Sequence, residues 1–70
     1  MDSQKFRESV GKNIKRIREK ADLTQAEAAK KAGINVNYFA VIERGEVTTS
    51  SEKLTKIARA LGVSVAEITK

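Results

Sequence analysis

Residues 24–45 read TQAEAAKKAGINVNYFAVIERG, and this stretch predicts two short helices joined by a tight turn. Thr24 and Glu27 have the Ser/Thr-x-x-Glu spacing of a capping box, in which the hydroxyl and the carboxylate satisfy free backbone donors reciprocally. The first helix is therefore expected to start at Gln25. Gly33 can adopt the left-handed conformation that ends a helix, so this helix is short.

The second helix of this stretch is expected to run from Val36 to about Arg44. Asn35 is a good N-cap, and Ile34 and Phe39 have the spacing of a hydrophobic staple. Two helices joined by so short a turn cross steeply and need small residues where they approach. We therefore predict a helix-turn-helix over residues 25–44.

The two faces of the second helix differ in composition. The inward side of the pair has a core pattern of small and apolar residues, namely Ala28, Ala29, Ala32, Gly33, Ile34, Phe39 and Ile42. The opposite arc has no core pattern and is expected to be exposed; its residues are Val36, Asn37, Ala40, Val41 and Arg44.

Helical periodicity continues on both sides of this pair. Before it, one long helix is expected from Asp2 or Ser3 to Lys20, with a single apolar stripe of Phe6, Val10, Ile14, Ile17 and Ala21. After it, the stretch EVTTSS is a loop whose Thr49 or Ser50 caps a fourth helix. That helix has apolar residues at positions 54, 57, 58 and 61 and stops at Gly62.

A fifth short helix is predicted after Gly62, because Ser64 and Glu67 have the spacing of a second capping box. The fold class expected is therefore all-α, a compact five-helix bundle. With 70 residues and no internal repeat or linker, the chain is expected to form one domain over residues 1–70.

Composition excludes several classes of site. The chain has no cysteine and no histidine, so thiolate, zinc and histidine acid–base chemistry are absent. Its nine acidic residues have no paired or metal-ligand spacing, so we expect no enzyme, metal or cofactor, and no small-molecule ligand is evident. Without a long apolar run, a soluble, cytoplasmic protein is expected rather than a membrane protein. The formal net charge of +5 favours a polyanionic partner.

Two runs carry a resemblance to a known family. Residues 14–45, IKRIREKADLTQAEAAKKAGINVNYFAVIERG, and residues 54–68, LTKIARALGVSVAEI, resemble the Cro/CI-type helix-turn-helix (XRE) family from Ile14 to Ile68. In outline the chain is also similar to the controller proteins of restriction-modification systems. The resemblance implies the fold of phage-repressor DNA-binding domains. It also implies a transcriptional regulator that binds double-stranded DNA, as a homodimer on a two-fold symmetric operator.

The resemblance also implies residue roles. Gln25 matches the position that contacts a phosphate from the start of the second helix, where free amides favour an anion. Val36, Asn37, Ala40 and Val41 match positions that face base edges in the major groove. Asparagine can pair with adenine, whereas valine can only pack on a thymine methyl or a sugar.

Four further positions take roles at the border of this surface. Tyr38 and Arg44 are candidates for phosphate contacts. In the family, the positions of Arg18 and Glu43 form an ion pair that orients the recognition helix. The loop 46–51 departs from the family, which often has basic residues there, so fewer ionic contacts are expected.

An alternative function remains open, because the exposed arc is largely apolar. The same fold can serve as a protein-interaction module, in an antitoxin-like or coactivator-like role. Binding to a protein through this arc should respond weakly to salt, whereas binding to DNA should weaken steeply as salt rises.

Overall fold

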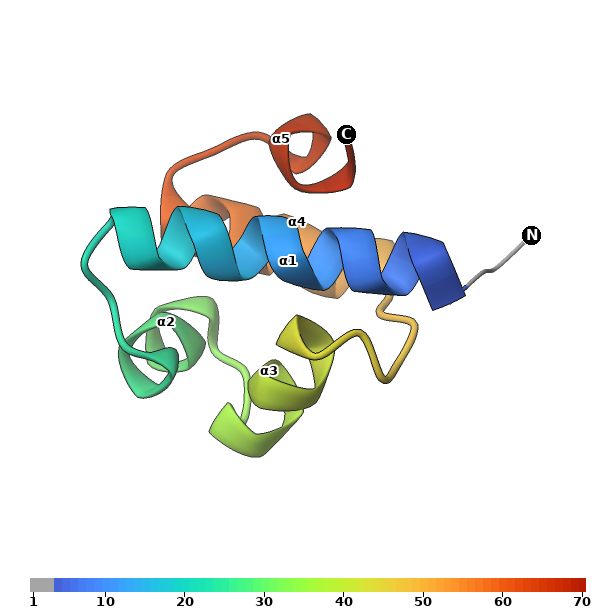
Figure 1. Cartoon of the computed structure of the whole chain (residues 1–70). Helices are drawn as coiled ribbons and strands as arrows, with labels where there is room; N and C mark the ends of the chain where they lie inside the picture. The colour runs from blue at the N-terminus through green and yellow to red at the C-terminus, as the bar shows by residue number, and fades with distance from the viewer. Residues whose placement is uncertain (1–3) are drawn as a thin grey trace.

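The computed structural model describes residues 4–70, which form five α-helices and no strand. The helices are α1 (Gln4–Lys20), α2 (Gln25–Ala32), α3 (Val36–Glu43), α4 (Ser51–Leu61) and α5 (Val65–Thr69). In Figure 1, α2 and α3 lie on one side of α1, α5 lies on the other side, and α4 passes behind α1. The predicted all-α fold of five helices is confirmed. None of the helices within residues 4–70 is long and apolar enough to cross a bilayer.

The first two helices begin and end largely where their sequence signals indicate. The start predicted for the first helix, at Asp2 or Ser3, lies outside the described residues, and its end at Lys20 is confirmed. The Thr24 hydroxyl accepts a hydrogen bond from the Glu27 amide at 3.0 Å, and the Thr24 amide donates to the Glu27 carboxylate at 2.8 Å. This capping box starts α2 at the predicted residue.

The turn between α2 and α3 follows the predicted glycine and asparagine. Gly33 ends α2 in the left-handed region with a φ of 71°. This conformation would be strained for a residue with an L side chain. The Asn35 side chain accepts a hydrogen bond from the Asn37 amide at 2.8 Å and so caps α3. The helix ends at Glu43 with Arg44 as its C-cap, within one residue of the prediction.

The last two helices also start at hydroxyl caps. Ser50, rather than Thr49, caps α4. Ser64 accepts a hydrogen bond from the Glu67 amide at 3.3 Å, as predicted for α5. The Glu67 carboxylate, however, contacts the Lys70 ammonium at 3.2 Å instead of returning to the cap. Only one half of the predicted second capping box is therefore present, because Lys70 offers the carboxylate a charged partner.

The buried face of α1 differs from the predicted stripe. Val10, Ile14 and Arg18 are buried, whereas Phe6 is 45% exposed and Ala21 is exposed in the turn after the helix. The prediction that Phe6 and Ala21 continue the buried stripe is wrong. The buried row takes every fourth residue and includes an arginine, because a carboxylate on α3 neutralises its charge. Hydropathy alone could not place that row.

The core lies where α1, α2, α3, α4 and α5 meet. Its fully buried large side chains are Ile14, Phe39, Ile42, Ile57 and Ile68. On α2, Ala28, Ala29 and Ala32 are buried, and these small residues let α3 and α4 pack closely on that helix. Ala28 and Phe39 are both completely buried in the same hydrophobic cluster.

Two residues of α1 join it to other helices in ways that the sequence analysis missed. A side chain at Gly11 would overlap the backbone carbonyl of Glu43, so a glycine lets α1 and the end of α3 approach. The Asn13 amide donates a hydrogen bond of 2.7 Å to the Ile68 carbonyl and thereby satisfies the end of α5. Both contacts are long-range, and no local pattern marks them.

Candidate nucleic-acid interface

The α2–turn–α3 unit presents one side of α3 to solvent. The Ile34 amide donates a hydrogen bond of 2.9 Å to the Ala29 carbonyl, which closes the turn. On the inner side of α3, Phe39 is completely buried. A helix of eight residues that buries one side in this way exposes the other.

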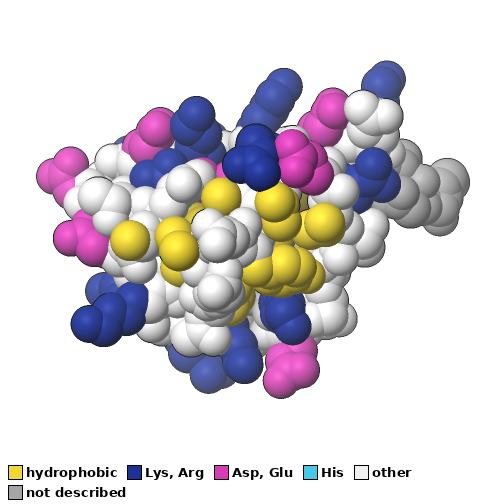
Figure 2. Space-filling view, turned by 90° about the horizontal axis from the view of Figure 1, so that it is seen from below, with side chains coloured by type: hydrophobic (Ala, Val, Ile, Leu, Met, Phe, Trp, Pro, Cys, Tyr) yellow, Lys and Arg dark blue, Asp and Glu magenta, His cyan; other side chains and the backbone are white. Residues whose placement is uncertain are grey.

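The α3 outer face consists of Val36, Asn37, Ala40 and Val41. Val36 is 39% exposed, Asn37 is exposed, and Ala40 and Val41 are partly exposed. Figure 2 shows hydrophobic side chains gathered over the middle of the side of the molecule that α2 and α3 form, with Lys and Arg side chains around its edges. The structure thus brings together the four residues that the resemblance assigns to base contacts, on a largely apolar surface.

A buried ion pair joins α3 to α1. Arg18 Nε donates to Glu43 Oε2 at 2.6 Å, and Arg18 Nη2 donates to Glu43 Oε1 at 3.1 Å. Arg18 Nη1 donates to the Leu23 carbonyl at 2.7 Å, so all three guanidinium nitrogens have acceptors. The hydrogen bond to Glu43 raises the pKa of Arg18. This bidentate geometry fixes the position of the end of α3 relative to α1.

Gln25 takes part in the same buried network. Its side-chain amide donates to Glu43 Oε1 at 2.9 Å, and the residue is half-buried at the first position of α2. The family resemblance implies a phosphate contact for Gln25, and no pattern in the sequence predicts this bond. The amide nitrogen has two hydrogens, so Glu43 uses one and orients the group. Gln25 therefore links the start of α2 to the end of α3.

Tyr38 lies at the border of the presented surface. The residue is half-buried and packs against the core. The ammonium of Lys53, on α4, lies 5.6 Å from the centre of its ring, within the range of a cation–π contact. This pairing between α3 and α4 could not be read from the sequence. It places a cation beside the phenol.

Arg44 is held by a neighbouring carboxylate. Its Nε donates to Glu46 Oε2 at 2.8 Å, and its Nη2 donates to Glu46 Oε1 at 3.3 Å. These hydrogen bonds raise the pKa of Arg44 and lower the pKa of Glu46, so each favours the charged form of its partner. Both side chains are more than half exposed. A phosphate that binds Arg44 must therefore compete with Glu46.

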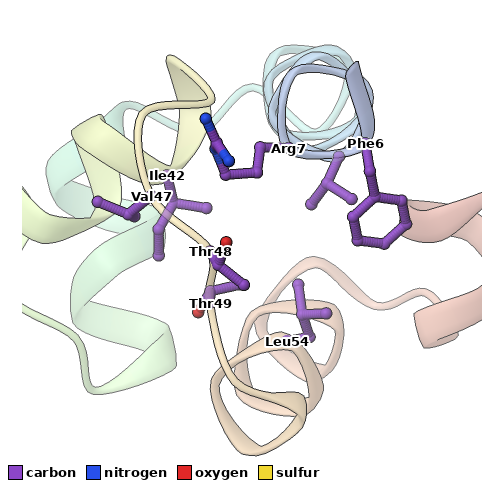
Figure 3. Close-up of a pocket in the computed structure, with 8 residues that line it drawn as sticks. Phe6, Arg7, Ile42, Val47, Thr48, Thr49 and Leu54 are labelled. Atoms are coloured by element: carbon purple, nitrogen blue, oxygen red, sulfur yellow. The ribbon is translucent and has the colours of Figure 1, made fainter. Parts of the chain in front are cut away.

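The loop between α3 and α4 closes over the start of α1. Figure 3 shows a small pocket between these segments, with side chains from α1, α3, the loop and α4 pointing into it. It is lined by Phe6, Arg7, Val10, Ile42, Val47, Thr48, Thr49 and Leu54. Arg7 Nε also donates to the Gly45 carbonyl at 3.2 Å. These contacts attach the loop that contains Glu46 to the body of the domain.

Cations line two open hollows beside α4, one against the end of α2 and one against the start of α3. Lys30 and Lys31, at the end of α2, line an open hollow together with Lys56 and Arg59 of α4. Lys56 also lines a neighbouring hollow beside Tyr38. Such a surface attracts polyanions without requiring any one contact.

The geometry matches a known family. The helix-turn-helix family matches residues 14–68. The chain belongs to this family. One relative is the immunity repressor protein of Bacillus phage phi105, which is 42% identical over 60 residues; the match covers 86% of this chain and 42% of the repressor. The chain thus spans less than half the length of this repressor.

Two further proteins match this chain over most of their own length. An uncharacterized HTH-type transcriptional regulator, y4dJ of Sinorhizobium fredii, is 37% identical over 63 residues, covering 90% of this chain and 82% of the relative. The crystal structure of the restriction-modification controller protein C.AhdI from Aeromonas hydrophila superposes with a TM-score of 0.87 at 26% identity. That match covers 89% of this chain and 94% of the controller. The resemblances to the repressor-type family and to the controller proteins are both confirmed.

Proposed function

We propose that this protein is a cytoplasmic transcriptional regulator that binds double-stranded DNA as a homodimer, with α3 as its recognition helix. Its membership of the helix-turn-helix family and its repressor and regulator relatives support DNA binding. The formal net charge of +5 suits a polyanionic partner. Residues 1–70 act as one DNA-binding domain. The proposed activity is binding, without catalysis and without a cofactor.

The α3 outer face supplies the proposed base contacts. Val36 and Asn37 lie in the first turn of α3, and the N-terminal residues of a recognition helix are those that enter the major groove. Ala40 and Val41 follow one turn later on the same face. Asn37 is the residue of this set that can form hydrogen bonds with a base edge.

The phosphate contacts come from residues around that face. Gln25 keeps one amide hydrogen for a phosphate, and the first turn of α2 adds unpaired backbone amides. Tyr38 lies in the first turn of α3, and Arg44 is its C-cap. Phosphates bind Arg44 by displacing Glu46, which the exposure of that pair permits.

The observation that carries the proposal is the rigid presentation of an exposed face. The same eight-residue helix that exposes Val36 and Asn37 is locked on its other side by the buried pair of Arg18 and Glu43. A helix held by a bidentate ion pair keeps its orientation, and base readout needs side chains that are positioned before binding.

The geometry of B-DNA supports the proposed dimer. A recognition helix of eight residues reads only a few base pairs, and two helices on one side of the duplex must lie about 34 Å apart. We therefore expect two inverted half-sites one helical turn apart. Sedimentation of the complex should give two chains for each site, and one chain at saturation would contradict the dimer.

Selection from random duplexes tests the proposal directly. The protein should enrich a two-fold symmetric site, and binding to that site in gel-shift titrations should weaken steeply as the salt concentration rises. Lys56→Gln should bind all duplexes more weakly, because it removes a cation from the hollow beside Tyr38 of α3. Failure to enrich any duplex at low salt would overturn the proposal.

A second candidate function is a protein-interaction module of the same fold. The observation that favours it is the apolar character of the α3 outer face, where Val36 is one of the two exposed large hydrophobic residues found within residues 4–70. A protein partner on this face would bind with little dependence on salt. The same salt titration therefore separates the two functions.

A further inference from the structure

The α3 outer face offers few groups for hydrogen bonding. Of its four residues, Val36, Ala40 and Val41 have aliphatic side chains, and Asn37 alone has a donor and an acceptor. Hydrogen bonding from this face therefore reads about one base pair with full discrimination. Site specificity needs more than one base pair, so the aliphatic residues must contribute.

Two polar side chains next to this face, Gln25 and Arg44, have partners elsewhere. Gln25 donates to Glu43 inside the buried network, at 2.9 Å. Arg44 donates to Glu46 through two nitrogens, and it lies at the far end of α3 from Asn37. The second amide hydrogen of Gln25 is assigned to a phosphate, and reading a base through Arg44 would break its pair with Glu46, so neither residue reads a base beside Val36.

The major groove contains one apolar group that depends on sequence. Thymine presents its C5 methyl there, whereas guanine, adenine and cytosine present only hydrogen-bonding atoms and a small C–H edge. An aliphatic side chain at the floor of the groove gains by burying that methyl. Facing a polar base edge, it would instead remove water without replacing the lost hydrogen bonds.

We propose that the α3 outer face selects its DNA site by packing Val36 and Val41 against thymine methyl groups. The inference rests on the proposed function, since it requires α3 to lie in the major groove. Val36 is the main methyl-binding residue, because it is the most exposed aliphatic side chain of α3 and lies in its first turn.

The spacing of the two valines fits thymines that are not adjacent. Five residues of α-helix rise about 7.5 Å and turn about 140° around the helix axis, so Val36 and Val41 lie at the two edges of the α3 outer face. Since successive base pairs are about 3.4 Å apart, the two valines can contact methyl groups at least about two base-pair steps apart. Asn37 adds one hydrogen-bonded base, so each half-site is expected to combine an adenine contact with one or two required thymines.

Replacement of thymine by deoxyuridine tests the inference, because it removes only the methyl. In the site enriched by selection, each thymine is replaced singly, and the affinity of the unmodified protein is measured by fluorescence anisotropy. Binding should weaken about fourfold at each contacted thymine, the factor that corresponds to one buried carbon. 5-Bromouracil at the same position should restore the affinity, since bromine is similar in size to a methyl group.

Protein variants identify which side chain contacts each thymine methyl group. Val36→Ala and Val41→Ala should each abolish the difference between thymine and deoxyuridine at one position of the half-site. Val65→Ala, on α5, is the matched control and should retain the full difference. Because the readout is a ratio for each variant, a change in stability does not affect it.

The outcomes are distinct. Methyl reading is overturned if the enriched site is bound tightly but no deoxyuridine substitution changes the affinity. It is also overturned if the difference persists in both valine variants. If no duplex is enriched at all, the proposed function itself fails, and methyl reading fails with it.

Discussion

Glu43 and Arg44 are adjacent at the end of α3, yet their ion pairs lie in opposite surroundings. Glu43 pairs with Arg18 across 25 positions of sequence, and the two side chains are 2% and 9% exposed. Arg44 pairs with Glu46 two residues away, and those side chains are 56% and 54% exposed. The buried pair fixes where α3 lies. The exposed pair is screened by water and can exchange its carboxylate for a phosphate.

The largest effect is expected from breaking the buried pair. Glu43→Ala leaves the Arg18 guanidinium buried without its carboxylate, and we expect a loss of about 3 to 5 kcal/mol in the free energy of unfolding. Urea denaturation followed by circular dichroism measures this loss. Glu46→Ala is the matched control and should leave the unfolding midpoint unchanged. Equal unfolding midpoints for the two variants would show that the buried pair contributes no more to stability than the exposed pair.

Removal of an apolar side chain should also lower stability much more on the buried side of α3 than on its exposed side. Phe39→Ala empties a completely buried site and should cost about 3 to 5 kcal/mol. Val36→Ala, on the exposed side of the same helix, should change stability by less than about 0.5 kcal/mol. Thermal melts of both variants make the comparison. A melting temperature lowered by only a degree or two in Phe39→Ala would contradict it.

The packing partner of Phe39 can be tested in the same background. The Cro/CI-type family usually has a larger aliphatic residue at the position of Ala28 and a smaller one at the position of Phe39. We therefore infer that the phenyl ring fills the space that Ala28 leaves. Adding Ala28→Leu to Phe39→Ala should recover part of the lost stability, because it restores core volume. A further loss would show that the two sites do not share one space.

Local signals were sufficient to predict most of the fold. The capping box at Thr24 and the left-handed glycines at 33 and 62 set helix ends through contacts within a few residues, and the structure has them where the sequence indicates. The α3 outer face was predicted for a related reason, since helical periodicity separates Phe39 from Val36.

Contacts between distant segments could not be predicted in this way. A glycine inside a helix, such as Gly11, is unfavourable by local propensity. Its role is explained only by the close approach of the Glu43 carbonyl from α3. Phe6 fits the apolar stripe by periodicity. The residues of α1 that are buried, however, lie in line with Arg18, and Phe6 is not among them. The bond from Gln25 to Glu43 also depends on where α2 and α3 meet. Each depends on tertiary packing rather than on local sequence.

On the exposed side of α3, substitution of Asn37 should have an effect of intermediate size on DNA affinity. Asn37→Ala should weaken binding to the selected site by about 1 to 3 kcal/mol, because one base loses its hydrogen-bonding partner. Binding to a scrambled duplex should be nearly unchanged, since no phosphate contact is lost. Titration of both duplexes at fixed salt gives the two numbers. An equal loss on both duplexes would remove Asn37 from base readout.

The smallest effect concerns the exposed pair itself. Arg44→Ala should weaken binding to all duplexes alike and lower the salt dependence of log K by about one unit, because one fewer phosphate is neutralised. Glu46→Gln should act in the opposite direction. It removes the carboxylate that competes with phosphate for Arg44, so binding should tighten on every duplex.

A double-mutant cycle shows whether the effects of Arg44→Ala and Glu46→Gln on DNA affinity arise from the same interaction. If Glu46 acts on DNA through Arg44, the gain from Glu46→Gln should largely disappear in the Arg44→Ala background, apart from the repulsion that any surface carboxylate exerts on DNA. Glu67→Gln measures that general repulsion, because Glu67 is exposed on α5 and its carboxylate pairs with Lys70 rather than with Arg44. Equal gains from Glu46→Gln and Glu67→Gln would reduce the exposed pair to one more surface charge. A gain confined to Glu46→Gln, and dependent on Arg44, would show that the carboxylate holds Arg44 back from the phosphate.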